Sequence, residues 1–399
     1  MHRILVIQNI NDARKELNKI GVSSQGIEVM APKSMSNSIK LTNVKVGAAN
    51  ILKQEMLSIG GDAAVSRGVV EGSVKKSDVI LLGNFDKIKK LVNKLNYQNI
   101  FGLPEIRTYL QQELDNHLNN KTNKLDCGGY NLFLDKLHII GILNITPDSF
   151  SDGNKFFDLD KALEHAKKMI EEGADIIDIG GESTRPGAKK VDISTEIERV
   201  LPVVKEIRKM SDIPISIDTT KAKVAKKAIE NGANIINDIS ALRFDNKMVE
   251  ILKKYRNIPV ILMHMQGSPA DMQNNPCYDD TIDEILSFLS KRIDFCLQNG
   301  INKDRIIIDP GIGFGKRHKD NLIILKKLQE FKSLQVPVLL GASRKSFINR
   351  IYTSSVTERL EGSLATTSIA FNHNIEFIRV HDVRKHYKFI KTLSAIRNN

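Results

Sequence analysis

Three segments follow one another in the sequence: DIIDI (175–179), TEIERVLPVVKEIRKM (195–210) and PISID (214–218). The first and the last are short and rich in isoleucine, which is typical of buried β-strands. The middle segment repeats apolar residues at three- and four-residue spacing, as an amphipathic helix requires. This order predicts a βαβ unit, in which the two strands lie parallel.

The same alternation recurs from about residue 136 onward. Each parallel strand needs a crossover that returns to the same end of the sheet, so eight repeats favour a closed barrel. We therefore predict an α/β fold, a (β/α)8 TIM barrel, with an open doubly wound sheet as the alternative. The candidate strands are 137–145, 175–179, 214–218, 234–239, 260–264, 305–309, 336–341 and 377–380. The candidate helices include 159–172, 195–210, 221–231, 281–299 and 321–331, and Gly173, Gly232 and Gly300 are placed to end three of them with a left-handed residue.

Residues 1–125 have a different pattern, with fewer and more widely spaced strand-like segments. We predict a small α/β amino-terminal domain of unknown role here and the barrel at 126–399. The polar stretch 119–129 is the predicted linker. The candidate strands of the first domain are 3–8 and 78–82, and its candidate helices are 46–58, 87–95 and 104–117.

Charge and composition argue against several classes of protein. The chain has 59 Lys+Arg against 47 Asp+Glu, a net charge of +12, but its arginines are not interleaved with aromatic residues, so we expect a solvated basic surface and no nucleic-acid partner. No apolar run approaches the roughly 18 residues of a membrane span, and the first residues lack a signal-peptide pattern. Cys127, Cys277 and Cys296 have neither disulfide nor zinc-ligand spacing, so we expect a cytoplasmic protein in a reducing compartment, without a membrane partner.

Polar residues cluster where the predicted strands end. In a barrel of this kind the catalytic groups lie at the carboxyl ends of the strands. This criterion selects Asn144, 182–187, Asp218, Asn237 with Asp238, His264, 309–316, 343–346 and 379–382.

The selected residues include two sets of different chemistry. One set offers hydrogen-bond acceptors and donors suited to a flat heterocycle with N–H groups along one edge; its members are Asp218, Asn237, Asp309 and Lys345. The other set suits an anion such as a phosphate; its members are Arg185, Arg379 and His381. Together they indicate a heterocycle that carries an anionic group.

Several of these residues also have structural interpretations. Asp218 could cap the helix that follows it, Glu182 could orient loop backbone, and His264 could be a satisfied histidine at a strand end. Asp238 points to the opposite face of its strand from Asn237, so we expect it to be structural. The glycine-rich segment 311–316 is neither a Walker loop nor a dinucleotide-binding motif, and alone it identifies no ligand.

Two long motifs resemble one enzyme family. GILNITPDSFSDG (141–153) and GESTRPG (181–187) closely resemble the first two signatures of the dihydropteroate synthases. The resemblance covers about 137–395, with small departures such as Ile145 and Ile312, where Val and Phe are common. Residues 1–125 look like the amino-terminal extension of the longer members. The further segments that follow in the order of the family are 216–219, 237–240, 263–267, 309–316, 343–346 and 379–382.

The resemblance implies a transferase of folate biosynthesis that is a sulfonamide target. It would join 7,8-dihydropterin-6-ylmethyl diphosphate to 4-aminobenzoate, giving 7,8-dihydropteroate and pyrophosphate, and it would act as a homodimer with Mg2+ as its cofactor, held by Asn144. The residues implied to act in catalysis are Asn144, Arg185, Asp218, Lys345, Arg379 and His381. Those implied to bind the pterin are Asp218, Asn237, Met263, Asp309 and Lys345; those for the diphosphate are Asn144, Arg185, Arg379 and His381; and those for 4-aminobenzoate are Phe150, Thr184, Pro186, Phe314 and Ser346.

Two other functions are compatible with parts of this pattern. A pterin-binding methyltransferase acting with a corrinoid protein would share the barrel and the carboxylates, but it gives no reason for the anion-binding set. A catalytically silent barrel that binds RNA through the basic amino-terminal domain is the second alternative. For the synthase we further expect the polar rim loops 148–156 and 183–188 to be mobile until the diphosphate binds, which would then complete the 4-aminobenzoate pocket.

Overall fold

The chain forms two compact units, Met1–Lys121 and Thr122–Asn399. The computed structural model describes residues 7, 9–118, 124–146, 155–183 and 190–398. Each unit has its own hydrophobic core.

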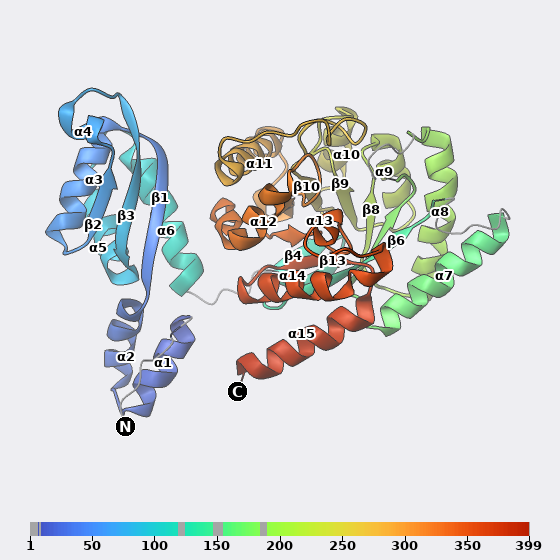
Figure 1. Ribbon diagram of the computed structural model, residues 1–399, viewed down its shortest axis with the longest axis horizontal. Helices are drawn as coiled ribbons and strands as arrows, with labels where there is room; N and C mark the ends of the chain where they lie inside the picture. The colour runs from blue at the N-terminus through green and yellow to red at the C-terminus, as the bar shows by residue number, and fades with distance from the viewer. Residues whose placement is uncertain (1–6, 8, 119–123, 147–154, 184–189, 399) are drawn as a thin grey trace. The chain divides into compact units, whose positions relative to one another are not determined.

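The second unit contains the predicted eight-stranded parallel barrel (Figure 1). The strands are β6 (His138–Asn144), β7 (Ile176–Gly180), β8 (Ile215–Asp218), β9 (Ile235–Asp238), β10 (Val260–Met263), β11 (Ile306–Asp309), β12 (Leu339–Leu340) and β13 (Phe377–Val380). They are arranged in the order β11-β10-β9-β8-β7-β6-β13-β12. A parallel bridge between Ile308 and Val338, and a 2.9 Å hydrogen bond from the Ile308 N–H to the Pro337 carbonyl, join the two ends of this order, so the sheet closes. Every predicted strand is confirmed, although β12 is shorter than 336–341.

Helices surround the barrel. Gly173, Gly232 and Gly300 have φ angles of +99°, +107° and +77°, which confirms the predicted left-handed helix ends. The predicted helix 321–331 is divided between an α-helix and a 3-10 helix. The helices are α7 (Lys155–Glu171), α8 (Ile193–Met210), α9 (Ala222–Ile229), α10 (Lys247–Lys254), α11 (Thr281–Gln298), η3 (Lys303–Arg305), α12 (His318–Lys326), η4 (Leu328–Leu334), α13 (Ser346–Asn349), η5 (Val356–Glu358), α14 (Leu360–Asn372) and α15 (Val383–Asn398).

A hairpin closes the amino ends of the barrel strands. Its strands, β4 (Lys124–Cys127) and β5 (Tyr130–Phe133), pair antiparallel, and Leu125 and Cys127 pack against the interior of the barrel. The prediction of a linker at 119–129 is therefore wrong for 124–129, while 119–123 lie outside the described residues. The stretch looks like a linker because it is mostly polar and ends in two glycines.

The first unit is the predicted small α/β domain. Its elements are α1 (Ile10–Lys19), α2 (Ser24–Met30), η1 (Ala31–Ser34), β1 (Ser36–Lys45), α3 (Val46–Ser58), β2 (Asp62–Val65), α4 (Arg67–Glu71), β3 (Lys76–Asn84), α5 (Phe85–Leu95) and α6 (Leu103–Leu118). The strands form an antiparallel sheet in the order β1-β3-β2, and α3, α5 and α6 contribute to its core. The three predicted helices and the strand at 78–82 are confirmed, whereas the predicted strand at 3–8 lies almost wholly outside the described residues. The sequence did not predict β1 because this edge strand is mostly polar.

In the part of the chain that the structure describes, no helix combines the length and the apolar content needed to cross a membrane.

Candidate active site

The inward-facing side chains of the barrel change from apolar to polar along the strands. The layer near the amino ends consists of Ile140, Ile176, Ile235, Ile261, Ile307, Leu339 and Phe377. Because side chains alternate along a strand, residues two positions further on also face inward. On five strands these residues are Asp178, Asn237, Met263, Asp309 and Arg379. Three predicted polar residues, Asn237, Asp309 and Arg379, therefore lie at one level inside the barrel, toward the carboxyl ends of its strands.

Asn144 and Asp218 flank a glycine at this end of the barrel. Asn144 pairs with Gly180, and Gly180 pairs with Asp218, across β6, β7 and β8. A Cβ atom on Gly180 would lie 3.3 Å from Asn144 Oδ1 and 3.6 Å from Asp218 Cβ. The glycine thus leaves space between an amide oxygen and a carboxylate.

Arg379 links the carboxylates of two neighbouring strands. Its Nε donates to Asp178 Oδ2 at 2.6 Å, and its Nη2 donates to Asp218 Oδ2 at 2.9 Å. Asp178 Oδ2 also accepts a 3.2 Å hydrogen bond from Asn237 Nδ2. Arg379 was assigned to the diphosphate set, yet it contacts a carboxylate of the pterin set, so the two sets lie next to each other.

Burial moves the pKa values of several site residues toward neutral pH. It raises the pKa of Asp218 to about 7, although Arg379 opposes this shift. Burial also raises the pKa of Asp309, against the effect of the hydrogen bond from Gly311. For Lys345, burial lowers the pKa to about 8, and Arg379 acts in the same direction. Acidic and basic groups with shifted pKa values in one pocket are typical of active sites.

The glycine-rich loop after β11 forms one wall of the site. The Gly311 N–H donates to Asp309 Oδ1 at 2.7 Å, which orients that carboxylate. Gly311 has a φ of +70°, and a Cβ there would lie 2.0 Å from the His264 carbonyl oxygen, so the backbone leaves no space for a side chain. Further along the loop, the Phe314 ring centroid lies 4.1 Å from Lys345 Nζ. This cation–π contact holds the ammonium group beside the loop.

Lys316 lies buried at the end of this loop, and the sequence did not reveal its role. Its Nζ is 2.9 Å from His264 Nδ1 and donates to the Phe314 carbonyl at 3.0 Å. Burial lowers the pKa of Lys316 to about 7 and lowers that of His264 well below its ordinary value. His264 is therefore neutral, and of its two interpretations the structure supports that of a satisfied histidine at a strand end.

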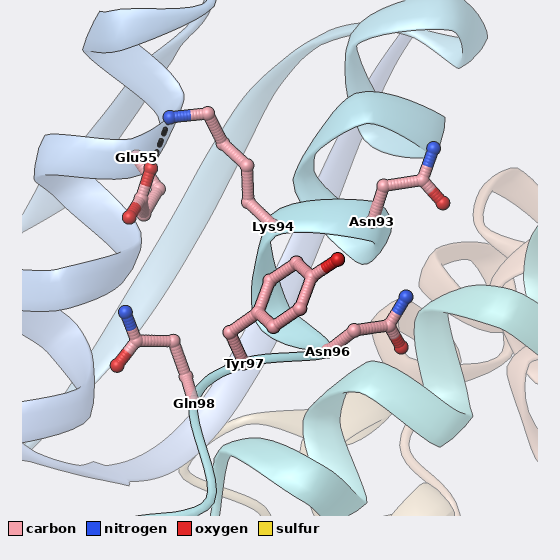
Figure 2. Close-up of a pocket in the computed structure, with 6 residues that line it drawn as sticks. All are labelled: Glu55, Asn93, Lys94, Asn96, Tyr97 and Gln98. Carbon is pink, nitrogen blue, oxygen red and sulfur yellow. Dashed lines mark hydrogen bonds and ion pairs between the residues drawn. The ribbon is translucent and has the colours of Figure 1, made fainter.

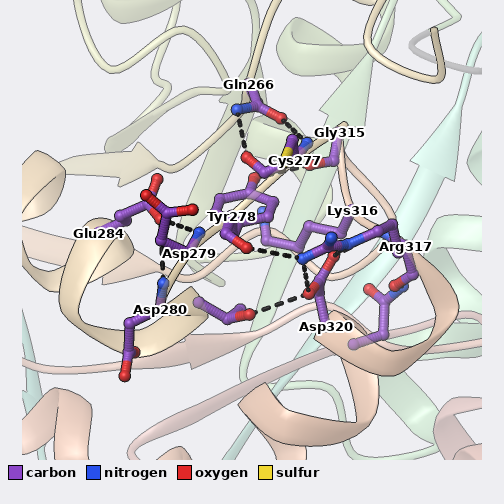
Figure 3. Close-up of polar contacts among 12 residues, drawn as sticks. Gln266, Cys277, Tyr278, Asp279, Asp280, Glu284, Gly315, Lys316, Arg317 and Asp320 are labelled. Atoms are coloured by element: carbon purple, nitrogen blue, oxygen red, sulfur yellow. Dashed lines mark hydrogen bonds and ion pairs between the residues drawn. The ribbon is translucent and has the colours of Figure 1, made fainter. Parts of the chain in front are cut away.

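Polar contacts fasten the loop after β10 to the loop after β11 (Figure 3). The Tyr278 hydroxyl donates to the Gly315 carbonyl at 2.6 Å. Gln266 exchanges two hydrogen bonds with the Cys277 backbone, at 3.0 and 3.1 Å. The two loops are thus joined to each other, and together they support the backbone around Phe314.

His381 and its neighbours occupy the ends of β12 and β13. His381 Nδ1 lies 3.1 Å from Ser343 Oγ, and burial lowers the pKa of His381 to about 3. It is therefore a neutral hydrogen-bonding group at physiological pH. Arg344 pairs with Asp382 through two contacts of 2.9 and 2.5 Å, and Ser346 is exposed at the start of α13.

The structure leaves part of the predicted site undescribed. The predicted residues that it places at the carboxyl ends of the strands, or in the loops that follow, are Asn144, Asp218, Asn237, Met263, Asp309, Phe314, Lys345, Ser346, Arg379 and His381. Phe150, Thr184, Arg185 and Pro186 lie outside the described residues, as do most of the rim loops 148–156 and 183–188.

Asp178 is the residue at this site that the sequence analysis missed. It lies within an isoleucine-rich strand whose pattern predicts only a hydrophobic core. The carboxylate is fully buried there and accepts hydrogen bonds from two predicted site residues, Asn237 and Arg379. The available signal was an acidic residue in a buried strand, two positions before Gly180 and so on the same inward face.

Asp238 and Glu182 have structural contacts. Asp238 Oδ1 accepts from the Ser240 N–H at 2.8 Å and from the Ser240 hydroxyl at 2.6 Å, as expected for a residue that caps a loop. Glu182 accepts from the Val191 N–H at 2.8 Å and from Lys221 Nζ at 2.7 Å. Glu182 therefore orients loop backbone beside β8.

The amino-terminal unit has a surface pocket of its own (Figure 2). Its volume is about 670 Å³, and it is lined by Glu55, Asn93, Lys94, Asn96, Tyr97 and Gln98. Lys94 Nζ donates to Glu55 at 2.6 Å, so the charged groups of the pocket neutralise each other. This arrangement contrasts with the barrel, where charged groups gather around a buried interior.

Comparisons with known proteins agree with the geometry of the barrel. The family of pterin binding enzymes matches residues 140–381. The dihydropteroate synthase of Clostridium beijerinckii is 47% identical over 263 residues, which are 66% of this chain and 95% of the relative. A probable bifunctional folylpolyglutamate synthase/dihydropteroate synthase of Haloferax volcanii is 34% identical over 399 residues, covering 98% of this chain and 47% of the relative. The similarity to this relative therefore extends through the amino-terminal unit.

Solved structures show the same relationship. A dihydropteroate synthase of Yersinia pestis in complex with a sulfonamide drug superimposes with a TM-score of 0.66 and 41% identity, covering 69% of this chain and 100% of that one. A Xanthomonas albilineans dihydropteroate synthase with 4-aminobenzoic acid gives a TM-score of 0.66 and 40% identity, covering 69% and 99%. The chain belongs to the pterin binding enzymes and, among them, to the dihydropteroate synthases, in a long form with an amino-terminal extension.

Proposed function

We propose that the polar layer at the carboxyl end of the barrel performs the dihydropteroate synthase reaction. This reaction joins 7,8-dihydropterin-6-ylmethyl diphosphate to 4-aminobenzoate and releases pyrophosphate. The observation that carries the assignment of residues is the contact of Arg379 with both Asp178 and Asp218, which brings carboxylate and guanidinium groups together inside the barrel. The solved relatives with 4-aminobenzoic acid and with a sulfonamide drug support a 4-aminobenzoate site in this chain.

The pterin binds through its N–H edge to Asp218, Asn237 and Asp309. A carboxylate accepts N–H donors on both oxygens, and burial has removed the water that would otherwise supply them. Burial raises the pKa of Asp218 and of Asp309. N–H donors from the ligand oppose this effect, because a hydrogen bond to a carboxylate stabilises its ionised form. Lys345 donates to acceptors of the ring, and Met263, packed with Phe314 in one buried cluster, supports its face.

The diphosphate binds to Asn144, Arg185, Arg379 and His381. Arg379 supplies positive charge, whereas the low pKa of His381 makes it a neutral N–H donor. Charge-assisted and neutral hydrogen bonds of this kind together surround a diphosphate.

Mg2+ fits this set of residues through Asn144. Among the residues that the structure describes, no group of three or more His, Cys, Asp or Glu side chains could hold a metal ion. Mg2+ does not need such a cage, because it commonly takes one or two protein oxygens together with phosphates and waters. The Asn144 amide oxygen lies against Gly180 near the Asp218 carboxylate. Bound there, Mg2+ would neutralise charge on the diphosphate.

The residues favour cleavage of the carbon–oxygen bond before attack by the amine. Arg379 and Arg185 stabilise the negative charge that develops on the departing diphosphate. The electron-rich dihydropterin delocalises the positive charge left on its methylene carbon, and Asp218 and Asp309 stabilise that charge from the ring edge. The amine of 4-aminobenzoate attacks this carbon and then loses a proton, so a strong general base is unnecessary.

The 4-aminobenzoate binds beside the pterin, at the rim. Phe314 contacts one face of the ring, and Ser346 at the start of α13 binds the carboxylate. Phe150, Thr184 and Pro186, which the structure does not describe, complete the pocket.

The test is to incubate the purified chain with both substrates and Mg2+ and to measure pyrophosphate and 7,8-dihydropteroate. 7,8-Dihydropteroate should form only when both substrates are present, and each molecule of it should be accompanied by one pyrophosphate. The Asp218→Asn variant should lose most of this activity while keeping its circular dichroism spectrum. A folded chain that forms no 7,8-dihydropteroate when both substrates and Mg2+ are present would contradict the proposal.

We also propose a homodimer and a reducing, cytoplasmic location. Ile351, Tyr352 and Val356 are exposed apolar side chains close together in the sequence of the barrel unit, which supports an interface with a second copy. The three cysteines are free. Sedimentation equilibrium on the wild type and on an Ile351→Glu variant tests the dimer, which the variant should weaken.

A further inference from the structure

We infer that Asp178 is a positioning residue, which sets how Arg379 and Asn237 face the pterin pocket and thereby strengthens pterin binding without contacting the pterin. This inference rests on the proposed function, because it concerns the same pocket. Asp178 lies in the inward layer of the barrel, in β7, between the strands that carry its two partners.

The contacts of Asp178 converge on one atom. Oδ2 accepts from Arg379 Nε at 2.6 Å and from Asn237 Nδ2 at 3.2 Å. The side chain is 0% exposed, and Oδ1 is buried without a hydrogen-bond partner among the described residues. Since the side chain is fully buried, its ion pair with Arg379 is what neutralises the carboxylate.

This contact fixes the orientation of the Asn237 amide. An amide has a donating and an accepting end, and an ionised carboxylate only accepts. Asn237 must therefore turn Nδ2 toward Asp178, which leaves its Oδ1 as an acceptor for the pocket. A pterin N–H group is the matching donor, so Asp178 contributes to recognition through the amide.

Asp178 also shares Arg379 with a pterin-binding acid. The guanidinium contacts Asp178 through Nε and Asp218 through Nη2, which fixes its plane. When pterin N–H groups engage Asp218, Asp178 continues to balance the charge of Arg379. Without the Asp178 carboxylate, Arg379 would pair more strongly with Asp218 and would compete with the pterin.

The first measurement is calorimetric titration of 6-hydroxymethylpterin into the wild-type chain and into Asp178→Asn. The substitution keeps the shape of the side chain and removes its charge. We expect the Kd for the pterin to rise 10- to 100-fold, while the KM for 4-aminobenzoate changes less than twofold. Asp238→Asn is the matched control, because Asp238 is also buried but caps a loop on the opposite face of its strand. It should lower thermal stability and leave the pterin Kd within twofold of the wild-type value.

A mutant cycle separates positioning from a general effect of burial. In a chain that already carries Arg379→Gln and Asn237→Ala, adding Asp178→Asn should change the residual pterin Kd less than twofold. An equal loss with and without these partners would overturn the inference, as would an unchanged Kd in the single variant.

A structure of the wild-type chain with 6-hydroxymethylpterin gives an independent test that does not depend on how the variants fold. Asp178 should retain its contacts to Arg379 Nε and Asn237 Nδ2, and Asn237 Oδ1 should accept from the ligand. A pterin bound with these contacts broken would overturn the inference alone. A wild-type chain that binds no pterin would instead contradict the proposed function, and the inference with it.

Discussion

At the scale of single residues, burial controls the chemistry of the barrel mouth. It raises the pKa of Asp218 to about 7 and lowers that of Lys345 to about 8. Each of these groups is costly to hold in its charged form unless a partner replaces the lost water. A ligand that brings N–H donors to the acids therefore gains more here than it would on an exposed surface.

Replacing Asp309 with alanine should weaken pterin binding. The ring N–H groups that donate to Asp309 would remain unpaired in a buried pocket, at a cost of about 1–3 kcal/mol, or roughly 5- to 150-fold in Kd. Calorimetry with 6-hydroxymethylpterin measures this loss. Asp294→Ala removes the same charge from an exposed position on α11 and should have no effect. Unchanged affinity in a folded Asp309→Ala variant would place Asp309 outside the pocket.

Pterin affinity should depend on pH through Asp218. Its pKa is raised to about 7, so below that pH the group is increasingly protonated and accepts N–H donors less well. The affinity should therefore rise with pH up to about 7 and then level off. Asp218→Asn should remove this rise, measured by titration between pH 5.5 and 7.5.

His381 supplies the control for this pH dependence. Its pKa is lowered to about 3, so it stays neutral throughout the range and His381→Asn should leave the shape of the profile unchanged. A profile that flattens in His381→Asn but persists in Asp218→Asn would show that the histidine, and not the acid, titrates.

At the scale of elements, the loops are shaped by close backbone contacts as much as by side chains. The loop after β11 passes against the loop after β10, where Gly311 meets the His264 carbonyl and Gly315 meets the backbone of Gln266. The same loop carries the N–H that orients Asp309 and the aromatic ring that holds Lys345. A displacement of this backbone would therefore disturb both the proposed pterin site and the proposed 4-aminobenzoate site.

Gly311→Ala should damage stability and pterin binding together. A Cβ there would lie 2.0 Å from the His264 carbonyl oxygen, in addition to the strain of a φ of +70°. Gly300→Ala isolates the second effect, because Gly300 has a φ of +77° with no atom within 4 Å of its Cβ. The control should cost about 1 kcal/mol and keep pterin affinity. Equal losses of melting temperature in the two variants would show that the contact with His264 is unimportant.

Across the whole molecule, the helices and strands of the barrel are predictable from the sequence because the spacing of apolar residues differs between a helix and a strand. The isoleucine-rich strands and the left-handed glycines at Gly173, Gly232 and Gly300 are each read directly from the sequence. The hairpin β4–β5 was missed because it is stabilised by contacts with distant barrel residues and not by its own pattern. Asp178 was missed for a related reason, since its role depends on partners from other strands.

Binding at the rim should be ordered, with the diphosphate first. Thr184 and Pro186 of the proposed 4-aminobenzoate pocket flank Arg185 of the diphosphate set in the sequence, so an anion that holds Arg185 also places its neighbours. Pyrophosphate with Mg2+ should therefore raise the affinity of a sulfonamide, and by linkage the sulfonamide should raise that of pyrophosphate. Titrations with and without pyrophosphate measure the coupling. Arg185→Ala should abolish it, and equal affinities in the wild-type chain would show that the pocket is already formed.

We propose that the barrel unit by itself contains the complete site for dihydropteroate synthesis. The most direct measurement is the rate of 7,8-dihydropteroate formation by a fragment spanning 122–399, which keeps the β4–β5 hairpin, with both substrates and Mg2+ present. We expect 7,8-dihydropteroate to form at a rate within about threefold of that of the full chain, and only when both substrates are present. A fragment that is folded by circular dichroism and binds 6-hydroxymethylpterin, yet forms no 7,8-dihydropteroate, would contradict the claim, because residues of the amino-terminal unit would then be needed for the chemistry.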